Sequence, residues 1–230
     1  MDETIEVVVV RVFTDESGRN GNELGIVGSS TATASREQEI ANALGFSETV
    51  FLDALDEDGR AATIRIFTPA RELPFAGHPS VGTAWWLADR RAPVDVLREP
   101  AGDVEVTVDE DTAWVTARPE WTPDFEWLEL ASPADVDALD PFAFTSGQHY
   151  AYAWIDEEAG SIRSRMFAPD MGIIEDEATG AAAIALTARL GRSLTIAQGE
   201  GSDLSTELLA DGRVRVGGTT VYDRTIEATL

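Results

Sequence analysis

The stretch with the clearest chemical content runs from Ile66 to Leu87 and reads IFTPARELPFAGHPSVGTAWWL. It joins a strand, a turn rich in proline and glycine, and the start of a helix, with His78 between Gly77 and Pro79. Pro79 suits the first helical position, where a missing N–H costs nothing, so we expect His78 at or beside the N-cap and Gly77 to allow close backbone approach. An imidazole beside a helix N-terminus is typical of a site that binds an anion.

A similar unit recurs in the second half of the chain as MFAPDMGIIEDEATGAAAIALTARL. The matches are Phe67-x-Pro69 with Phe167-x-Pro169 and, after a two-residue slip, His78-x-x-x-Gly82 with Asp176-x-x-x-Gly180. This repeat predicts a duplicated fold. Two copies would place two helix N-termini, one carrying His78 and one carrying Asp176, facing each other across a cleft.

Glu48 is the candidate for proton transfer. In the stretch 46–52, the period of a β-strand puts Phe46, Glu48, Val50 and Leu52 on one face. If this face points to the core, burial favours the neutral acid and raises the pKa of Glu48 toward the range useful near neutral pH. The alternative is a glutamate near a strand end that leans out to water, and the local pattern leaves both readings open.

Two further polar residues need an interpretation. Asn22 follows the Asn20-Gly21 turn and could reach the cleft, or it could be an ordinary turn residue. His149 is the only histidine besides His78, and no helical spacing of histidines supports a metal site, so we expect none. The sequence has no cysteine, which excludes a disulfide framework and thiolate ligands.

The charge balance is strongly acidic. The 230 residues include 42 Asp and Glu against 17 Lys and Arg, a formal net charge of −25, and all 17 basic residues are arginine. Such a surface repels nucleic acid and anionic membranes, so neither is expected as a partner. Because salt screens the self-repulsion of an acidic coat, we expect a salt-adapted cytoplasmic protein; an acidic protein without salt adaptation is the alternative. No apolar run approaches the roughly 20 residues of a membrane span, and the start MDETIEV lacks a basic signal-peptide region.

The hydrophobic patterns predict mostly strands, with one long helix in each half. We expect strands at 5–13, 46–52, 62–67, 94–97, 104–108, 113–116, 148–155, 162–167, 195–199 and 213–216, and a last strand pair with a tail at 217–230. Helices are expected from a Ser35 cap, with Gln38 at the capping-box position, to Gly45, from Pro79 to Ala88, and at 178–190, with a short helix at 133–139. The fold class is therefore α+β with two similar lobes, residues 1–117 and 118–230, and the terminal strand may return to the first lobe.

The motifs together resemble the phenazine-biosynthesis (PhzF-like) family, which shares the diaminopimelate-epimerase type of fold. The resemblance covers nearly the whole chain, with order and spacing kept. Its motifs are Phe13-Thr14 with Gly21-Asn22-Glu23, then SETVF at 47–51, LPFAGHPSVGTA at 73–84, EDEATGAA at 175–182, Gln198-Gly199, and VRVGGTTV at 214–221.

The resemblance implies two lobes, each a curled mixed β-sheet, barrel-like, around a central helix, with a cleft between them and usually a homodimer. It implies Glu48 as the acid/base, with His78 and Asp176 flanking the substrate, and Asn22, Gly77, Gly180 and Ala181 as substrate-binding residues. The family's characterised reaction moves a proton within trans-2,3-dihydro-3-hydroxyanthranilate without metal or organic cofactor. Related branches of the fold catalyse epimerisations and racemisations.

Three departures from the family pattern bear on the substrate. Glu177 replaces the proline after the aspartate, Ala181 replaces a serine, and the C-terminal motif lacks its arginine in a chain shorter than usual. We therefore expect a cofactor-independent isomerase that acts on a small carboxylate-bearing metabolite, and we do not assign the phenazine precursor as that substrate. The alternatives are an epimerase or racemase, and a non-catalytic carboxylate-binding protein of the same fold.

Overall fold

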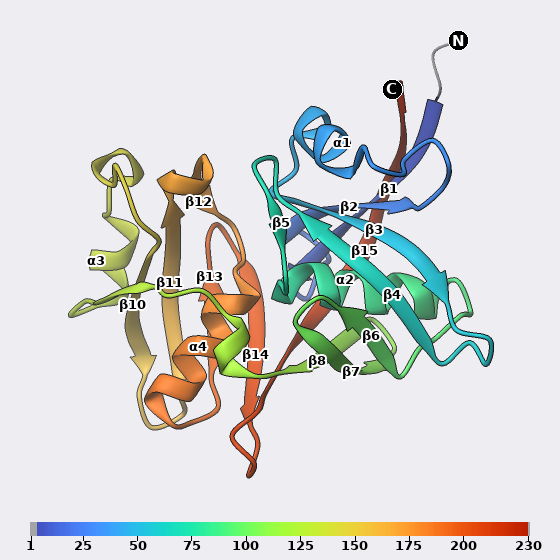
Figure 1. The fold of residues 1–230 in the computed structure, drawn as a ribbon. Helices are drawn as coiled ribbons and strands as arrows, with labels where there is room; N and C mark the ends of the chain where they lie inside the picture. Colours follow the sequence, from blue (N-terminus) through green and yellow to red (C-terminus); the bar gives the residue numbers. More distant parts are fainter. Residues whose placement is uncertain (1–3, 230) are drawn as a thin grey trace.

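The computed structural model describes residues 4–229 and has the α+β architecture that the sequence predicts, two similar lobes of curled mixed sheet with a diaminopimelate-epimerase-like fold (Figure 1). Its four α-helices among these residues are α1 (Glu37–Leu44), α2 (Gly77–Asp89), α3 (Pro133–Asp137) and α4 (Gly180–Leu190). Short 3₁₀ helices lie at Pro119–Trp121, Pro141–Ala143 and Pro169–Met171.

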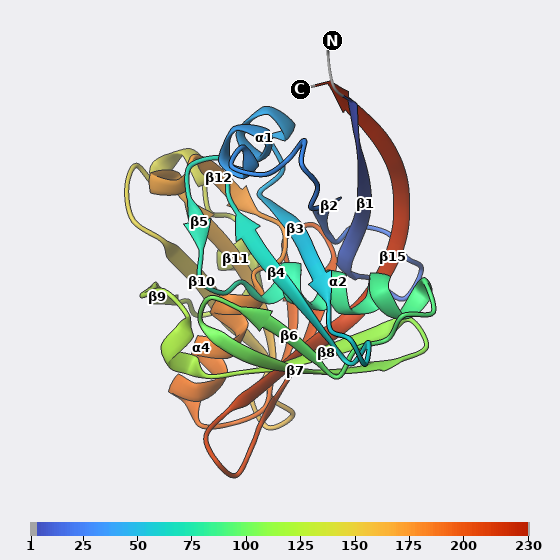
Figure 2. The ribbon, with the colours of Figure 1, turned by 45° about the vertical axis from the view of Figure 1, so that its right-hand side comes forward.

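The first lobe contains a closed barrel of eight strands. Around the barrel the strands are β1 (Thr4–Thr14), β2 (Asn22–Gly28), β3 (Glu48–Leu55), β4 (Ala61–Phe67), β6 (Val96–Glu99), β7 (Gly102–Asp109), β8 (Thr112–Ala117) and β15 (Val214–Thr229). β15 pairs with β8 and then, antiparallel, with β1, which closes the ring (Figure 2). The terminal strand therefore returns to the first lobe.

The second lobe holds an open sheet that shares β15 with the barrel. Its order is β9 (Glu126–Glu129), β10 (His149–Asp156), β11 (Ser161–Ala168), β13 (Thr195–Gln198), β14 (Ser202–Leu208) and β15. The senses of pairing from β9 to β15 repeat those from β2 through β3, β4, β6 and β7 to β8: parallel, antiparallel, parallel, antiparallel, antiparallel. This agrees with the predicted duplication, while the boundary between residues 117 and 118 stays a prediction.

Each copy contains the same local unit in its middle. In the first copy β5 (Glu72–Leu73) folds back on β4 before α2, and in the second β12 (Ile173–Asp176) folds back on β11 before α4. Both helices are rich in small and apolar residues on all sides, a composition typical of a buried helix. α2 packs against β1, β7, β8 and β15, and α4 packs against β14 and β15.

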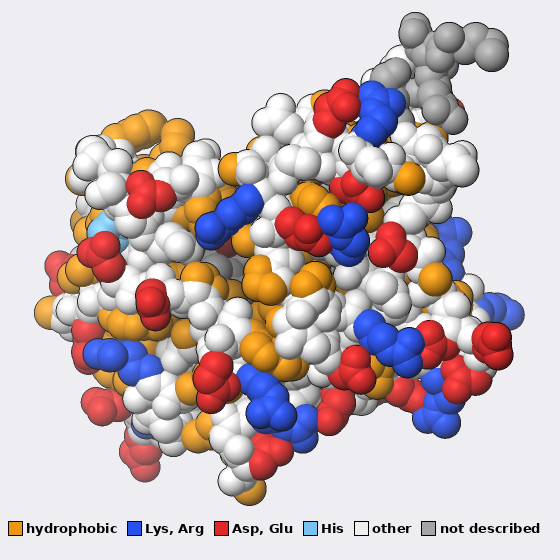
Figure 3. Space-filling model, in the orientation of Figure 1, with side chains coloured by type: hydrophobic (Ala, Val, Ile, Leu, Met, Phe, Trp, Pro, Cys, Tyr) orange, Lys and Arg blue, Asp and Glu red, His pale blue; other side chains and the backbone are white. Residues whose placement is uncertain are grey.

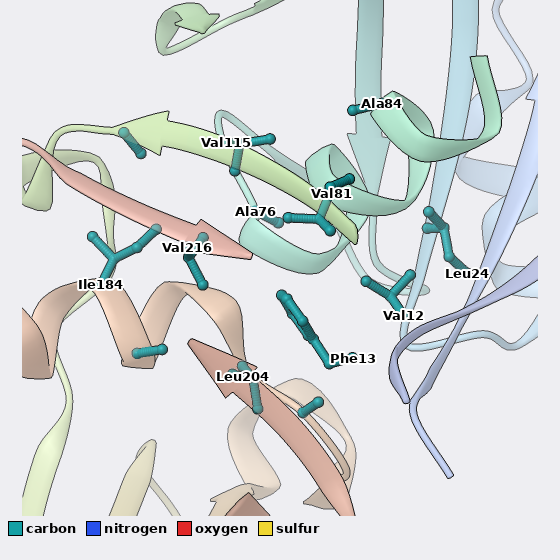
Figure 4. Close-up of a cluster of buried hydrophobic side chains, with 14 of the residues drawn as sticks. Val12, Phe13, Leu24, Ala76, Val81, Ala84, Val115, Ile184, Leu204 and Val216 are labelled. Carbon is teal, nitrogen blue, oxygen red and sulfur yellow. The ribbon is translucent and has the colours of Figure 1, made fainter. Parts of the chain in front are cut away.

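The two halves share one hydrophobic core. Phe13 of β1 is fully buried, with Val81 of α2 on one side and Leu204 of β14 on the other (Figure 4). Val216 of β15 belongs to the same cluster. Because a single core spans both sheets, the two helix N-termini are held in a fixed relation to each other.

The start of α1 differs from the prediction. Ser35 has a φ of +66° and does not cap the helix; the N-cap is Arg36, without a side-chain cap. Gln38 does not close a capping box but donates hydrogen bonds to the carbonyls of Thr68 and Pro69. A tertiary contact has therefore replaced the local cap, whereas Gly45 ends the helix in the left-handed conformation, as predicted.

Three other boundaries were predicted wrongly. α2 begins at Gly77 with Ala76 as its N-cap, so His78 lies inside the first turn. α4 begins at Gly180, two residues later than expected. The C-terminal stretch is one 16-residue strand, because it pairs along its length with β8, β14 and β1 in turn. Among residues 4–229, no helix is long and apolar enough to cross a membrane.

Candidate active site

The structure brings the three predicted catalytic residues together. Glu48 is the first residue of β3, His78 is the second residue of α2, and Asp176 is the last residue of β12. Their exposed fractions are 9%, 3% and 7%. Nε2 of His78 lies 3.6 Å from Oε2 of Glu48, and Asp176 is close enough for the charges of Glu48 and His78 to act on its pKa. The strand, the helix and the second-lobe hairpin therefore meet at one place.

Both faces of β3 are covered where Glu48 lies. The prediction had one buried face, which carries Glu48 and Val50. Thr49 and Phe51, on the opposite face, are as buried as Val50. The reason is that α1 and its apolar neighbours cover the second face, while β2 and β4 flank the strand on both edges. The buried reading of Glu48 is correct, and the leaning-out alternative is wrong.

The two helix starts touch each other rather than facing across a cleft. A Cβ atom built on Gly77 would lie 2.7 Å from the carbonyl carbon of Gly180, and one on Gly180 would lie 2.9 Å from Cα of Gly77. Only glycine permits this approach of two backbones. The space directly between the two helix ends is therefore closed, and Ala181 of α4 lines a cavity beside them.

Burial shifts the pKa of each of the three groups. It raises the pKa of Glu48 to about 7, against a smaller lowering effect of the Ser47 hydroxyl. It lowers the pKa of His78 to about 4, against opposing effects of Asp176 and the Glu23 carbonyl. Burial, together with the negative charge of Glu48, raises the pKa of Asp176 to about 6. Loss of water around a charged group is the common cause.

Glu48 and His78 each keep a free polar atom. Oε2 of Glu48 and Nε2 of His78 are buried and have no hydrogen-bond partner among the described residues. The Glu23 carbonyl acts on the other side of the imidazole, which fixes a tautomer with the proton on Nδ1 and leaves Nε2 as an acceptor. The 3.6 Å separation is too long for a hydrogen bond but short enough for proton transfer after a small movement.

Asp176 is held by hydrogen bonds from both halves of the chain. Nδ2 of Asn22 donates to Oδ1 of Asp176 at 2.7 Å and to the carbonyl of Ala178 at 3.0 Å, and the Thr179 hydroxyl donates to Oδ2 of Asp176. Asn22 is only 6% exposed and accepts a hydrogen bond from the Ser47 hydroxyl. The ordinary-turn reading of Asn22 is therefore wrong, because its side chain bridges the halves at the site.

A buried amide fixes the turn before α4. Gln198 donates to the Asp176 carbonyl and to the Thr179 hydroxyl, and its Oε1 accepts from the Thr179 amide and from the Tyr150 hydroxyl. With that proton given to Gln198, the Tyr150 hydroxyl oxygen accepts from the Ser164 hydroxyl at 2.9 Å. Sequence reasoning did not assign these roles. Two signals were available: Gln198-Gly199 is one of the motifs shared with the family, and Gln198 ends an apolar strand where an apolar residue would be ordinary.

A cavity of about 350 Å³ opens beside Glu48 and Asp176, whereas His78 is not among the residues that line it. Its polar lining includes Glu48, Asp176, Thr179, Arg71 and Gln148. The apolar lining comes from both lobes: Leu73, Pro74, Phe75, Ala76, Trp121, Pro123, Phe125, Met166, Met171, Ile173 and Ala181. Trp121 and Phe125 lie between β8 and β9, in a segment to which the sequence analysis assigned no role, because nothing local shows where such a segment packs.

Glu177, where the family has proline, is engaged with the turn after β13. Its carboxylate accepts hydrogen bonds from the amides of Glu200 and Gly201 and from the Ser202 hydroxyl. Ser202 in turn accepts from the Gly21 amide. The additional carboxylate therefore faces away from substrate space and links the turn beside Gln198 to the turn before Asn22.

The described residues contain no group of three or more histidine, cysteine, aspartate or glutamate side chains that could hold a metal ion. Nε2 of His149 lies 2.6 Å from the carbonyl of Ser146, and Nδ1 lies 3.5 Å from Glu126. These contacts occupy His149 away from His78.

Known proteins share both sequence and fold with this chain. The family model for phenazine biosynthesis-like proteins (PhzC-PhzF) matches residues 10–143 and 144–224. The trans-2,3-dihydro-3-hydroxyanthranilate isomerase of Pseudomonas aeruginosa is 29% identical over 230 aligned positions, covering 84% of this chain and 82% of the relative. The enzyme of that name from Pseudomonas chlororaphis is 32% identical, covering 70% of each chain.

Solved structures support the fold. A phenazine biosynthesis protein of Bacillus anthracis superposes with a TM-score of 0.73 at 20% identity, covering 99% of this chain and 100% of the other. A hydroxyproline epimerase of Agrobacterium vitis, with bound trans-4-hydroxy-L-proline, gives a TM-score of 0.64 at 12% identity, covering 99% and 93%. From these matches, the chain belongs to the phenazine biosynthesis-like (PhzC-PhzF) family and is an isomerase of that family.

Proposed function

We propose that this isomerase moves a proton within a small carboxylate-bearing metabolite, without a cofactor, and that Glu48 is its acid/base. The observation that carries the proposal is the state of the Glu48 carboxyl. It is buried, it lines the cavity, and its Oε2 atom has no hydrogen-bond partner among the described residues. A pKa of about 7 lets both the base and the acid form exist near neutral pH.

The reaction balances within one substrate molecule. Ionised Glu48 removes a proton from a carbon next to an electron-withdrawing group, and the electron pair of the broken C–H bond moves into that group. Neutral Glu48 then returns the proton to another carbon of the same substrate. No oxidant or reductant is consumed, and one acid/base group of this kind contributes roughly 10²–10⁴ in rate.

Neighbouring groups would support the two steps. The touching N-termini of α2 and α4 carry partial positive charge and unpaired amides, and Ala181 at the start of α4 lines the cavity. These helix ends would stabilise negative charge that develops on the reacting part of the substrate. Asp176 and His78 flank the same place, and His78, neutral above about pH 4, offers Nε2 as an acceptor toward Glu48. Asn22 would keep Asp176 in position.

Epimerisation is the second candidate. Glu48 and Asp176 both line the cavity, and burial raises the pKa of both. These two carboxyl groups of the enzyme, one on each face of a substrate carbon, could act as base and acid. An isomerase would change the position of a double bond or hydrogen, whereas an epimerase would only invert a stereocentre, so product analysis by chiral chromatography separates the two.

The test compares Glu48→Gln with Glu99→Gln. Glu99 is also a buried glutamate that accepts a hydrogen bond from a serine, Ser80, but it does not line the cavity. Each variant is incubated in deuterated water with small carboxylates, beginning with trans-2,3-dihydro-3-hydroxyanthranilate, and exchange of carbon-bound hydrogen is followed by NMR. We expect Glu48→Gln to lose exchange and Glu99→Gln to keep it. Wild-type exchange in Glu48→Gln would exclude Glu48 as the base.

We also propose that the protein is a salt-adapted cytoplasmic enzyme that acts as a homodimer. The excess of carboxylates supports salt adaptation, and acidic side chains and arginines are scattered over the face shown in Figure 3. Light scattering in molar salt, at several protein concentrations, tests the dimer. A mass near the monomer value of 24.8 kDa at all concentrations would contradict it.

A further inference from the structure

The charged side chains that line the cavity differ in whether they form ion pairs. Four charged side chains take part: Glu48, Asp176, Glu72 and Arg71. Glu72 is bound by Arg65 through two parallel hydrogen bonds of 2.7 and 2.8 Å. Arg71, the cation of this set, forms no ion pair within residues 4–229. Most other arginines of the chain do pair with carboxylates, which makes an unpaired guanidinium at the cavity notable in so acidic a protein.

The backbone that presents Arg71 is fixed. The Thr68 amide donates to the Arg71 carbonyl at 2.9 Å, and the Arg71 amide donates to the Thr68 hydroxyl at 3.0 Å. Gln38 and Asn42 of α1 donate to the Pro69 carbonyl, which ties the turn to the first lobe. The turn therefore holds the base of the Arg71 side chain in place, while the side chain itself is exposed at the solvent end of the cavity.

The geometry points to Arg71 as the residue that binds the substrate's carboxylate at the cavity mouth. This inference rests on the proposed function and refines it. The sequence assigned the carboxylate to the space between two helix ends, but Gly77 and Gly180 are in contact and close that space. Arg71 supplies what the rest of the lining lacks, because a guanidinium presents paired donors that match a carboxylate.

The lining between the two ends of the cavity defines the substrate class. Phe75, Trp121 and Phe125 line the cavity, and the ring centroids of Phe75 and Trp121 are 5.8 Å apart. A flat, largely apolar body suits these walls. The substrate would then place its carboxylate at Arg71, its body against the rings, and its reacting carbon toward Glu48. Removing the carboxylate charge should weaken binding without affecting the apolar contacts.

The test uses two probes of nearly the same shape, anthranilate and its neutral carboxamide, anthranilamide. Calorimetry measures the affinity of each probe for the wild type, Arg71→Gln and Arg90→Gln. All measurements use one salt concentration, chosen so that the three proteins have the same melting temperature. Arg90 is the matched control: it is exposed, at the far end of α2, forms no ion pair among the described residues, and does not line the cavity.

We expect the wild type to prefer anthranilate, and Arg71→Gln to lose about tenfold in anthranilate affinity while its anthranilamide affinity stays unchanged. Arg90→Gln should bind both probes as the wild type does. If Arg71→Gln and Arg90→Gln lose anthranilate affinity equally, the protein's overall charge explains the loss and the inference is overturned. Retention of the preference in Arg71→Gln, or binding of neither probe to the wild type, would also overturn it, and the hydrogen-exchange test of Glu48 would be untouched by either result.

Discussion

The Nε2 atom of His78 lies 3.6 Å from Oε2 of Glu48, and burial favours a neutral pair over an ion pair between about pH 4 and pH 7. Burial raises the pKa of Glu48 to about 7 and lowers the pKa of His78 to about 4. Between these values the carboxyl keeps its proton and the imidazole has none to add. The distance alone would suggest a salt bridge, but taking both charges out of water costs more than their attraction returns. The proton on Glu48 is consequently available for transfer.

The first prediction concerns the pH dependence of turnover. Glu48 must be ionised in the free enzyme to remove a proton, so kcat/KM should rise with pH along a limb with an apparent pKa near 7. Glu99→Gln should show the same limb. If Glu48→Gln keeps substantial activity and the same rising limb, the limb belongs to another group. Asp176, with a pKa of about 6, would then be the first to test.

The second prediction concerns stability and Glu99. Burial raises the pKa of Glu99 to about 8 from an ordinary value of 4.5, so the folded protein holds this proton more tightly than the unfolded chain. The contribution of Glu99 to stability is therefore complete below pH 4.5 and is lost as pH rises through 8. Glutamine stays neutral throughout. Glu99→Gln should gain roughly 2–4 kcal/mol relative to the wild type between pH 5 and pH 8.

Urea denaturation at the two pH values, in one salt concentration, measures this difference. The control is Glu57→Gln, which changes the same atoms at an exposed position. If Glu99→Gln and Glu57→Gln change equally with pH, the effect belongs to net charge, and the inference about burial is wrong.

The third prediction concerns the contact between the two helix starts. Alanine at Gly77 would place its Cβ 2.7 Å from the backbone of Gly180, and neither backbone can move without disturbing the shared core. Gly77→Ala should lower the free energy of unfolding by about 1–3 kcal/mol and reduce activity. Gly28→Ala is the control, because nothing lies within 4 Å of a Cβ there. Equal melting temperatures for the two variants would show that the helix starts are not tightly apposed.

The fourth prediction concerns salt. With a formal charge of −25, the protein should lose stability on dilution from molar salt to roughly 0.1 M, where the Debye length grows to about 10 Å. Scanning calorimetry at a series of sodium chloride concentrations measures the change. The dependence should weaken near pH 4, because protonated carboxyls no longer repel one another. A melting temperature at pH 7 that is flat or higher in low salt would argue against salt adaptation.

Much of the site was predictable because its residues stand in local patterns. Gly77-His78-Pro79 marks a helix start whatever packs around it, and Glu48 stands at the head of a β-branched and aromatic run. The second unit around Asp176 repeats the first closely enough to predict the duplication. Strand and helix periods depend on neighbours in sequence, so the sequence alone was sufficient for the fold class and for these positions.

Tertiary structure decided how far the groups are from one another and from water. Whether β3 is buried on one face or on two depends on α1, and whether the helix ends enclose a cleft depends on Gly77 meeting Gly180. Gln38 does not form the predicted cap but donates to a carbonyl thirty residues away. Asn22 donates to Asp176 in the other half of the chain. These contacts join residues that are distant in sequence, and their burial sets the pKa of Glu48. No local pattern carries that information, because desolvation is a property of everything packed around a group.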